Sequence, residues 1–262
     1  MEDFLEPAIA TARKAGALLL PYFERRVRVE YKGEVDLVTE ADRASEALIL
    51  EELRKHFPQH AVVAEESGSH AGDSGYRWYV DPLDGTTNFL HGIPLFCISI
   101  GLEREGQLVA GVIYNPASDE LFTAEKGKGA FLNDRRRLRV AARKTLADAV
   151  VATGIPHRGR PGHPGFMREL ETVMREVAGI RRTGSAALDL AWTAAGRFDG
   201  YWERNLKPWD LAAGLVILRE SGGIANDING GEKMLETGDV LAGNGAIVKS
   251  ITTLLAGTPA QA

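Results

Sequence analysis

The sequence has little of several features that would assign it to a class at once. Its 262 residues include one cysteine, so no disulfide can form within the chain, which favours a reducing cytoplasm. Its 31 lysines and arginines do not exceed its 36 acids, which argues against binding nucleic acid through bulk charge. It lacks the roughly 18 successive apolar residues of a membrane span and a basic, apolar signal peptide at its start. We therefore expect a soluble cytoplasmic protein without direct membrane or nucleic-acid contacts, whose chemistry takes place in a pocket.

The overall composition is that of an ordinary globular protein, with 44% hydrophobic and 26% charged residues. This composition excludes a disordered chain, a collagen-like repeat and a small domain held by disulfides. The length allows one large domain or two packed lobes. The single cysteine, Cys97, lies in an apolar run and is expected to be a small buried residue rather than a nucleophile.

The hydrophobic pattern changes near residue 145. Before it, we expect amphipathic helices at 3–27 and after Thr39, then strands between 61 and 140 with a hairpin turning at Glu105-Gly106. After it, strands alternate with helices, which is typical of an α/β layer. The expected strands are 149–153, 180–182, 198–202 and 240–242, and the expected helices are 164–177, 185–195, 209–221 and a closing helix. The chain is thus predicted to pack an antiparallel-rich first half against an α/β second half.

The densest acidic segment is Trp78–Asn88, WYVDPLDGTTN. An apolar strand ends at Asp81, a proline turn follows, and Asp84 comes three residues later, so the two carboxylates can converge on one point. Converging carboxylates repel unless a cation lies between them, and oxygen-only ligands suit Mg²⁺. If 85–87 opens a helix, its free N–H groups favour an anion. On its own, this segment is equally compatible with a plain turn.

Three further acidic segments favour a metal site over a plain turn. They are Asp36–Asp42 at an expected helix start, Ala64–Gly68 directly after a strand, and Lys207–Asp210 at the start of an apolar helix. Each has an ordinary explanation as a helix cap, a solvated loop or a charge that complements the helix dipole. These separate explanations do not account for the occurrence of all the segments together in this order.

Taken together, these segments resemble the inositol monophosphatase family of Mg²⁺-dependent, lithium-sensitive sugar phosphatases. One family signature is similar to residues 78–88, and a second to WDLAAG at 209–214 with ESGG at 220–223; DLVTEAD at 36–42 and AEESG at 64–68 also fit. The resemblance implies a layered αβαβα fold of the α+β class. It places most metal ligands in an N-terminal subdomain, 1–145, and the substrate pocket with Asp210 in a C-terminal subdomain, 146–262.

The resemblance also implies a metal-ligand set. Glu65, Asp81 and the backbone carbonyl of Leu83 would hold a first Mg²⁺. Asp81 would bridge to a second, held by Asp84 and Asp210, and Glu65 would help to hold a third, weaker one. Two or three magnesium ions per active site are therefore expected.

Catalytic and substrate roles follow from the same resemblance. Asp42 and Thr86 are expected to orient and activate the attacking water, and Glu65 is expected to be catalytic through the metal it helps to hold. Gly85 and Thr86 would contact the phosphate. The residues expected to bind the rest of the substrate are Gly184, Ser185, Ala186, Glu203 and Asp210. Chemically this is metal-assisted hydrolysis, with no covalent phosphoenzyme.

Relatives in this family act on different phosphates, and the residues after Gly85-Thr86 are similar to the inositol type. We therefore expect an inositol-1-monophosphatase that releases myo-inositol and phosphate. The alternatives are a histidinol-phosphate phosphatase or a broader sugar phosphatase, with fructose 1,6-bisphosphate and 3′-phosphoadenosine phosphate as less favoured substrates. Lys32 matches a site lysine of some relatives only with a gap, and the loop 156–160 departs from the animal pattern, so both are left without a role.

A binding role is the alternative from a different class. Some bacterial relatives resemble accessory factors that associate with the transcription machinery, and Arg135–Arg137 or Arg181-Arg182 would be the contact patches. Short basic runs of this kind are more often solvated surface or internal salt-bridge partners. The resemblance further implies a homodimer.

Overall fold

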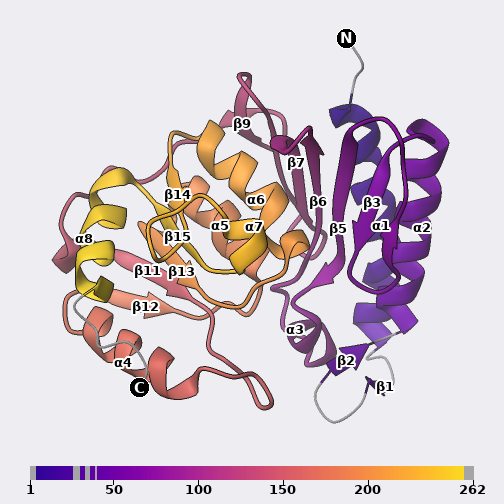
Figure 1. The fold of residues 1–262 in the computed structure, drawn as a ribbon. Coiled ribbons are helices and arrows are strands. Elements are labelled where there is room, and N and C mark those ends of the chain that lie inside the picture. The colour runs from indigo at the N-terminus through magenta and orange to yellow at the C-terminus, as the bar shows by residue number, and fades with distance from the viewer. Residues whose placement is uncertain (1–3, 26–29, 33–35, 39, 257–262) are drawn as a thin grey trace.

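Alternating layers of helices and sheets cross the molecule in the order helix, sheet, helix, sheet, helix (Figure 1). The outer helices on the N-terminal side are α1 (Leu5–Arg25) and α2 (Glu40–His56). The helices between the sheets are α5 (Ala186–Ala194) and α6 (Pro208–Glu220). The outer helices on the C-terminal side are α4 (His163–Met174) and α8 (Gly245–Ala256). The αβαβα prediction is therefore confirmed.

The structure is a computed structural model that describes residues 4–25, 30–32, 36–38 and 40–256. Within these ranges, no helix combines the length and the apolar character that crossing a membrane requires. Thr39, the expected helix cap, lies outside the described residues, as does the side chain of Lys32.

The larger sheet has eight strands in the order β10-β9-β8-β7-β6-β5-β3-β4. Their bounds are β3 Ala61–Ala64, β4 Gly68–His70, β5 Tyr76–Asp84, β6 Cys97–Arg104, β7 Gln107–Asn115, β8 Glu120–Glu125, β9 Gly129–Leu132 and β10 Arg136–Arg137. The expected hairpin joins β6 to β7 at Glu105-Gly106, where both residues adopt positive φ. All neighbouring strands are antiparallel except β3 and β5, which are parallel. Their carboxyl ends therefore meet at one edge of the sheet.

The second sheet has five strands in the order β12-β11-β13-β15-β14. Their bounds are β11 Val150–Thr153, β12 Gly179–Arg181, β13 Gly200–Glu203, β14 Ile224–Asn226 and β15 Val240–Gly243. β11 runs parallel to β12 and β13, and the other pairs are antiparallel. The smaller elements are the β1–β2 ribbon (Glu30–Lys32 and Asp36–Val38), α3 (Thr86–Leu90), η1 (Leu146–Asp148) and α7 (Met234–Thr237). The strands and helices expected after residue 145 all form, with ends shifted by a few residues.

The two sheets share a core through the helices between them. Every residue of α6 from Leu211 to Leu218 is buried, because one side of the helix faces the larger sheet and the opposite side faces the smaller one. The same apolar cluster contains Phe122 of β8 and Tyr201 of β13. The division of the chain into two subdomains at residue 145 stays a prediction.

Candidate active site

The parallel pairing of β3 with β5 brings two acids to one edge of the larger sheet. Ala64 is the register partner of Val80, and the N–H of Glu65 donates to the Val80 carbonyl at 3.2 Å. Glu65 follows Ala64 directly, and Asp81 follows Val80 directly in the neighbouring strand. They therefore occupy neighbouring positions at the carboxyl end of this strand pair.

A β-bulge shapes the segment between Asp81 and Asp84. The register with β6 shifts between these two residues, at a point where Pro82 has no N–H to donate to the ladder. The N–H of Leu83 instead donates to Asp81 Oδ1 at 3.0 Å. Both carboxylates are thus supplied by a strand that leaves its regular pairing at the site.

Gly85 follows this strand directly and adopts a conformation that favours glycine. Its φ of 94° is left-handed, and a Cβ there would lie 2.8 Å from the Leu95 carbonyl oxygen. The short helix α3 begins at the next residue, as the sequence suggested. Thr86 Oγ1 donates to the Leu83 carbonyl at 3.1 Å. This contact places the hydroxyl expected to orient water beside the carbonyl expected to bind metal.

Asp84 connects the larger sheet to the start of α5. Its Oδ2 accepts from Ser185 Oγ at 2.6 Å and from the N–H of Ala187 at 2.7 Å. Ser185 is also the N-cap of this helix and accepts from the N–H of Leu188. A carboxylate at a helix N-terminus is favoured by the helix dipole.

The smaller sheet and α6 supply two more acids. Glu203 ends β13, and its Oε2 accepts from the Tyr201 hydroxyl at 2.7 Å. Gly154 provides the space for this carboxylate, because a Cβ on Gly154 would lie only 1.8 Å from Glu203 Oε1. Asp210 lies in the first turn of α6 and accepts from the N–H of Lys207 at 2.7 Å. It is therefore a helix cap and a residue of the site together.

These residues surround one cavity of about 430 Å³. Of the twelve residues singled out from the sequence, eleven line it: Glu65, Asp81, Leu83, Asp84, Gly85, Thr86, Gly184, Ser185, Ala186, Glu203 and Asp210. Asp42 does not line the cavity. It is buried on α2, and its charge acts on Glu65. The folded chain thus gathers residues that are up to 145 positions apart.

The four candidate metal-binding acids have raised pKa values. Burial, and then the charges of Asp210 and other nearby acids, raises the pKa of Glu65 to about 8. Burial, followed by the charge of Asp84, raises the pKa of Asp210 to about 7. Burial also raises the pKa of Asp81 and of Asp84, and for Asp84 the hydrogen bonds from Ser185 and α5 oppose the shift. Ionising these carboxyls together is therefore costly without a compensating positive charge.

The donor set fits a hard divalent cation. It consists of oxygen atoms only, from acids that line one cavity and repel one another, and Mg²⁺ prefers such ligands. Oxygens of Asp81, Asp84 and Asp210 accept hydrogen bonds from backbone N–H groups, and Asp84 also accepts from a hydroxyl. In the described part of the chain, no three Asp, Glu, His or Cys side chains are gathered tightly enough to hold a metal as they stand.

One acid of the cavity was missed from the sequence. Asp189 lies in α5, is 1% exposed and accepts from Thr183 Oγ1 at 2.7 Å. Its burial raises its pKa well above the ordinary value. The signal was present in the sequence, because Asp189 is the one charged residue in the apolar run 186–192.

Four basic side chains were not assigned to the cavity from the sequence, although one of them, Arg182, was named as part of a possible patch for a partner. Arg158, Arg160, Arg182 and Lys207 line the cavity together with its acids. Within the described residues, none of the four forms an ion pair. The loop 156–160, which had no role from the sequence, therefore forms part of the cavity wall. Positive charge that is not paired with protein acids attracts an anionic ligand.

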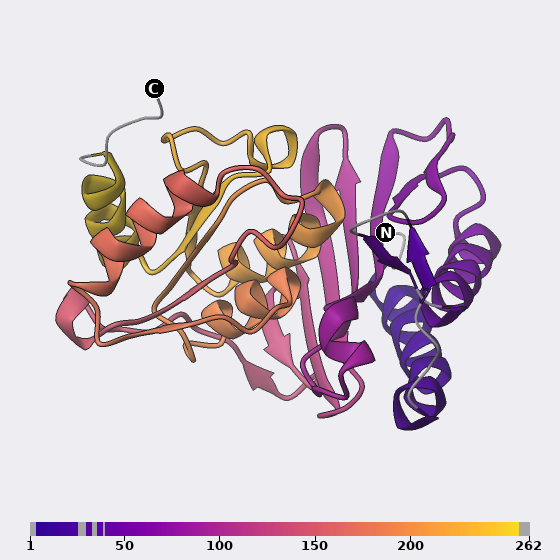
Figure 2. The same cartoon turned by 90° about the horizontal axis from the view of Figure 1, so that it is seen from below.

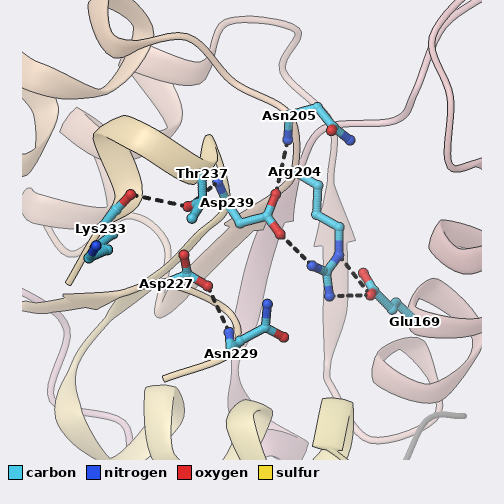
Figure 3. Close-up of polar contacts among 8 residues, drawn as sticks. All are labelled: Glu169, Arg204, Asn205, Asp227, Asn229, Lys233, Thr237 and Asp239. Atoms are coloured by element: carbon cyan, nitrogen blue, oxygen red, sulfur yellow. Dashed lines mark hydrogen bonds and ion pairs between the residues drawn. The ribbon is translucent and has the colours of Figure 1, made fainter. Parts of the chain in front are cut away.

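An ion-pair network holds the chain directly after Glu203 (Figure 3). Arg204 donates to Glu169 of α4 from Nε at 2.9 Å and from Nη2 at 2.6 Å. Its Nη1 donates to Asp239 Oδ2 at 2.6 Å, and the other oxygen of Asp239 accepts from the Asn205 N–H. The end of β13 is thus tied both to α4 and to the turn before β15. Figure 2 shows α4, in salmon, beside the yellow helix α8 near the end of the chain.

Comparison with known proteins gives one consistent match. A model of the inositol monophosphatase family matches residues 1–259. Inositol-1-monophosphatase of Mesorhizobium japonicum is 55% identical over 250 residues, 94% of each chain. A Salmonella typhimurium protein named Nus factor SuhB is 44% identical over 254 residues, 96% of this chain and 95% of the other. The solved structure of extragenic suppressor protein suhB from Bartonella henselae has a TM-score of 0.93 at 50% identity, covering 97% of this chain and 98% of the other.

Proposed function

This chain belongs to the inositol monophosphatase family, and from that premise we propose that it hydrolyses inositol 1-phosphate to myo-inositol and phosphate with the help of Mg²⁺. The family resemblance seen in the sequence motifs and the phosphatase class are confirmed by this membership. The observation that carries the proposal is the convergence of four acids, Glu65, Asp81, Asp84 and Asp210, on one cavity that also contains Glu203.

Five groups would hold the metal ions. They are the carboxylates of Glu65, Asp81, Asp84 and Asp210 and the carbonyl of Leu83. When bound, Mg²⁺ supplies positive charge for the phosphate and lowers the pKa of water. The acids contribute fixed positions and a net negative charge, which together select a divalent cation.

Water and phosphate are positioned by the segment after the bulge and by α2. Thr86 presents its hydroxyl at the cavity, and Asp42 lies buried beside Glu65. These residues would hold the attacking water in line with the phosphorus atom. Gly85, which can carry no side chain in its position, leaves its backbone open to the phosphate. Arg158, Arg160, Arg182 and Lys207 favour the approach of the substrate anion.

The inositol ring would lie against the start of α5 and the end of β13. Gly184, Ser185 and Ala186 form one wall, and Glu203 faces the cavity from the smaller sheet. A carboxylate accepts hydrogen bonds from ring hydroxyls. Burial raises the pKa of Glu203 to about 7, so a substrate that donates to its oxygens also stabilises its ionised form.

The test is phosphate release from a set of substrates by the full chain, with and without Mg²⁺ and Li⁺. The set contains inositol 1-phosphate, histidinol phosphate, fructose 1,6-bisphosphate and 3′-phosphoadenosine phosphate. We expect the highest kcat/KM with inositol 1-phosphate, an absolute need for Mg²⁺ and inhibition by Li⁺. A higher kcat/KM on another member of the set would replace the substrate assignment, and activity independent of Mg²⁺ would contradict the metal assignment.

Relatives named Nus factor SuhB support a second candidate, an accessory role with the transcription machinery. Arg135, Arg136 and Arg137 are exposed at the edge of the larger sheet and would be available to a partner. A pull-down with purified RNA polymerase tests this role, and no retention of the chain would remove it. The homodimer and the cytoplasmic location are part of the proposal, and sedimentation velocity tests the first.

A further inference from the structure

Two consecutive residues of α2 hold the backbone of two different loops of the active site. Ser45 is fully buried, and its Oγ donates to the Pro82 carbonyl at 2.9 Å. Glu46 is 3% exposed, and its two carboxylate oxygens accept from the N–H groups of Glu66 and Ser67, each at 2.8 Å. One turn of α2 therefore contacts both the loop that contains Pro82 and the loop that contains Glu66 and Ser67.

Each of these loops carries candidate metal ligands. Pro82 lies in the bulge between Asp81 and Asp84, and the N–H groups bound by Glu46 follow directly after Glu65. Asp42 precedes Ser45 and Glu46 by three and four residues, so all three side chains share one face of α2. A regular helix is stiff, and contacts made from adjacent helical positions fix the distance between the groups they hold.

That distance matters because the acids repel one another. Glu65 lies on one loop and Asp81 on the other, and no positive side chain forms an ion pair with either within the described residues. Without restraint, the two loops would be free to change their separation. Three hydrogen bonds between α2 side chains and backbone groups, one buried and two partly buried, oppose a change in this separation at the points next to the candidate ligands.

We propose that Ser45 and Glu46 are positioning residues for the divalent-cation site, setting the separation between the loop that carries Glu65 and the bulge that carries Asp81 and Asp84. The inference rests on the proposed function, because it assumes that these acids bind Mg²⁺. It assigns to α2 a role in metal affinity that is separate from its packing against the sheet.

The test is Glu46→Gln, with Mg²⁺ binding measured by isothermal titration calorimetry on the substrate-free full chain. Glutamine has nearly the same shape but offers one acceptor oxygen, and its NH₂ group would face an N–H donor. We expect the Mg²⁺ dissociation constant to rise about tenfold to a hundredfold, the range found for residues that orient metal ligands. Because excess Mg²⁺ refills the site, kcat at saturating Mg²⁺ should stay close to the wild-type value. Ser45→Ala should raise the dissociation constant in the same direction, by less.

Two variants separate positioning from general stability. Asp199→Asn removes a carboxylate that is equally buried and also accepts from a backbone N–H, that of Val150 at 2.8 Å, but does not line the cavity. It should lower the melting temperature and leave the Mg²⁺ dissociation constant unchanged. Glu51→Gln, the same change at an exposed position of α2, should alter neither.

The outcomes distinguish this inference from the proposed function. A dissociation constant for Glu46→Gln within about twofold of wild type would overturn the inference alone, provided that the wild type binds Mg²⁺. An equal rise of the Mg²⁺ dissociation constant in Asp199→Asn would also overturn the inference. The weaker binding would then be explained by lost stability and not by the position of the loops. If Glu46→Gln does not fold, an unchanged Mg²⁺ dissociation constant in Ser45→Ala overturns the inference. A wild-type chain that does not bind Mg²⁺ would overturn the proposed function and this inference together.

Discussion

Replacing Gly154 by alanine should displace the carboxylate of Glu203 without changing any group in direct contact with metal. The backbone of Gly154 is outside the left-handed region, so alanine fits its conformation. The added Cβ would nevertheless lie 1.8 Å from Oε1, 1.9 Å from Cδ and 2.1 Å from Oε2 of Glu203. The substitution therefore acts only through the steric clash between the new methyl group and the Glu203 carboxylate.

The size of the effect follows from these distances. The carboxylate has to move by about 1.6 Å to restore an ordinary contact of 3.4 Å. This movement breaks the 2.7 Å hydrogen bond from Tyr201, whose hydroxyl is buried, at a cost of about 1–3 kcal/mol. Misplacing a substrate-orienting group by about 1 Å can reduce the rate about a hundredfold. We therefore expect kcat/KM for inositol 1-phosphate to fall by about that factor.

The assay compares phosphate release from inositol 1-phosphate and from p-nitrophenyl phosphate, which has no ring hydroxyls. Gly154→Ala and Glu203→Gln should both lose more activity on the inositol substrate than on the aryl ester. Gly231→Ala is the matched control, because a Cβ there has no neighbour closer than 3.8 Å. Equal losses on the two substrates, or activity of Gly154→Ala close to wild type, would refute the assigned contact between Glu203 and the ring.

Two further predictions concern stability. Burial raises the pKa of Glu65 to about 8 and the pKa of Glu203 and Asp210 to about 7. The folded chain therefore binds more protons than the unfolded chain over this pH range. As a result, the melting temperature of the metal-free protein should fall as the pH rises from about 5 to about 8. A flat or rising profile in calorimetric scans would contradict these shifts, and Mg²⁺ should stabilise more at the alkaline end. Arg204→Ala should lower the free energy of unfolding by about 3 kcal/mol in urea titrations, because it leaves Glu169 buried without its cation. Arg175→Ala, which removes an exposed ion pair, is its control and should change stability little; an equal loss there would count against the network.

The candidate metal-binding acids could be named from the sequence because they lie in short segments that resemble the signatures of one family. Asp81 and Asp84 are three residues apart across a proline turn, and Asp210 opens a helix that starts with proline. The apolar periodicity likewise located most helices and strands. Such features depend on neighbours along the chain, and these are visible in the sequence itself.

The rest of the cavity depends on neighbours in space. Gly154 has no motif around it, and the basic pair that contains Arg182 suggested only a patch for a partner. Their places in the cavity wall follow from how the smaller sheet and α5 pack against the larger sheet. Ser45 and Glu46 read as ordinary positions of an amphipathic helix, and their partners lie at least 20 residues away. Asp189 was detectable as a lone acid in an apolar helix, but its contact with Thr183 was not.

The most direct test of the account is Mg²⁺-dependent phosphate release by Asp84→Asn compared with the wild type. Asparagine keeps the volume and an acceptor for the N–H of Ala187, and it removes a charge that acts on Asp81 and Asp210. The variant should therefore fold, with a melting temperature in the absence of metal at least equal to that of the wild type, and should release no phosphate from inositol 1-phosphate with Mg²⁺. Near-normal activity in this variant would contradict the claim that the acids of this cavity form a catalytic magnesium site.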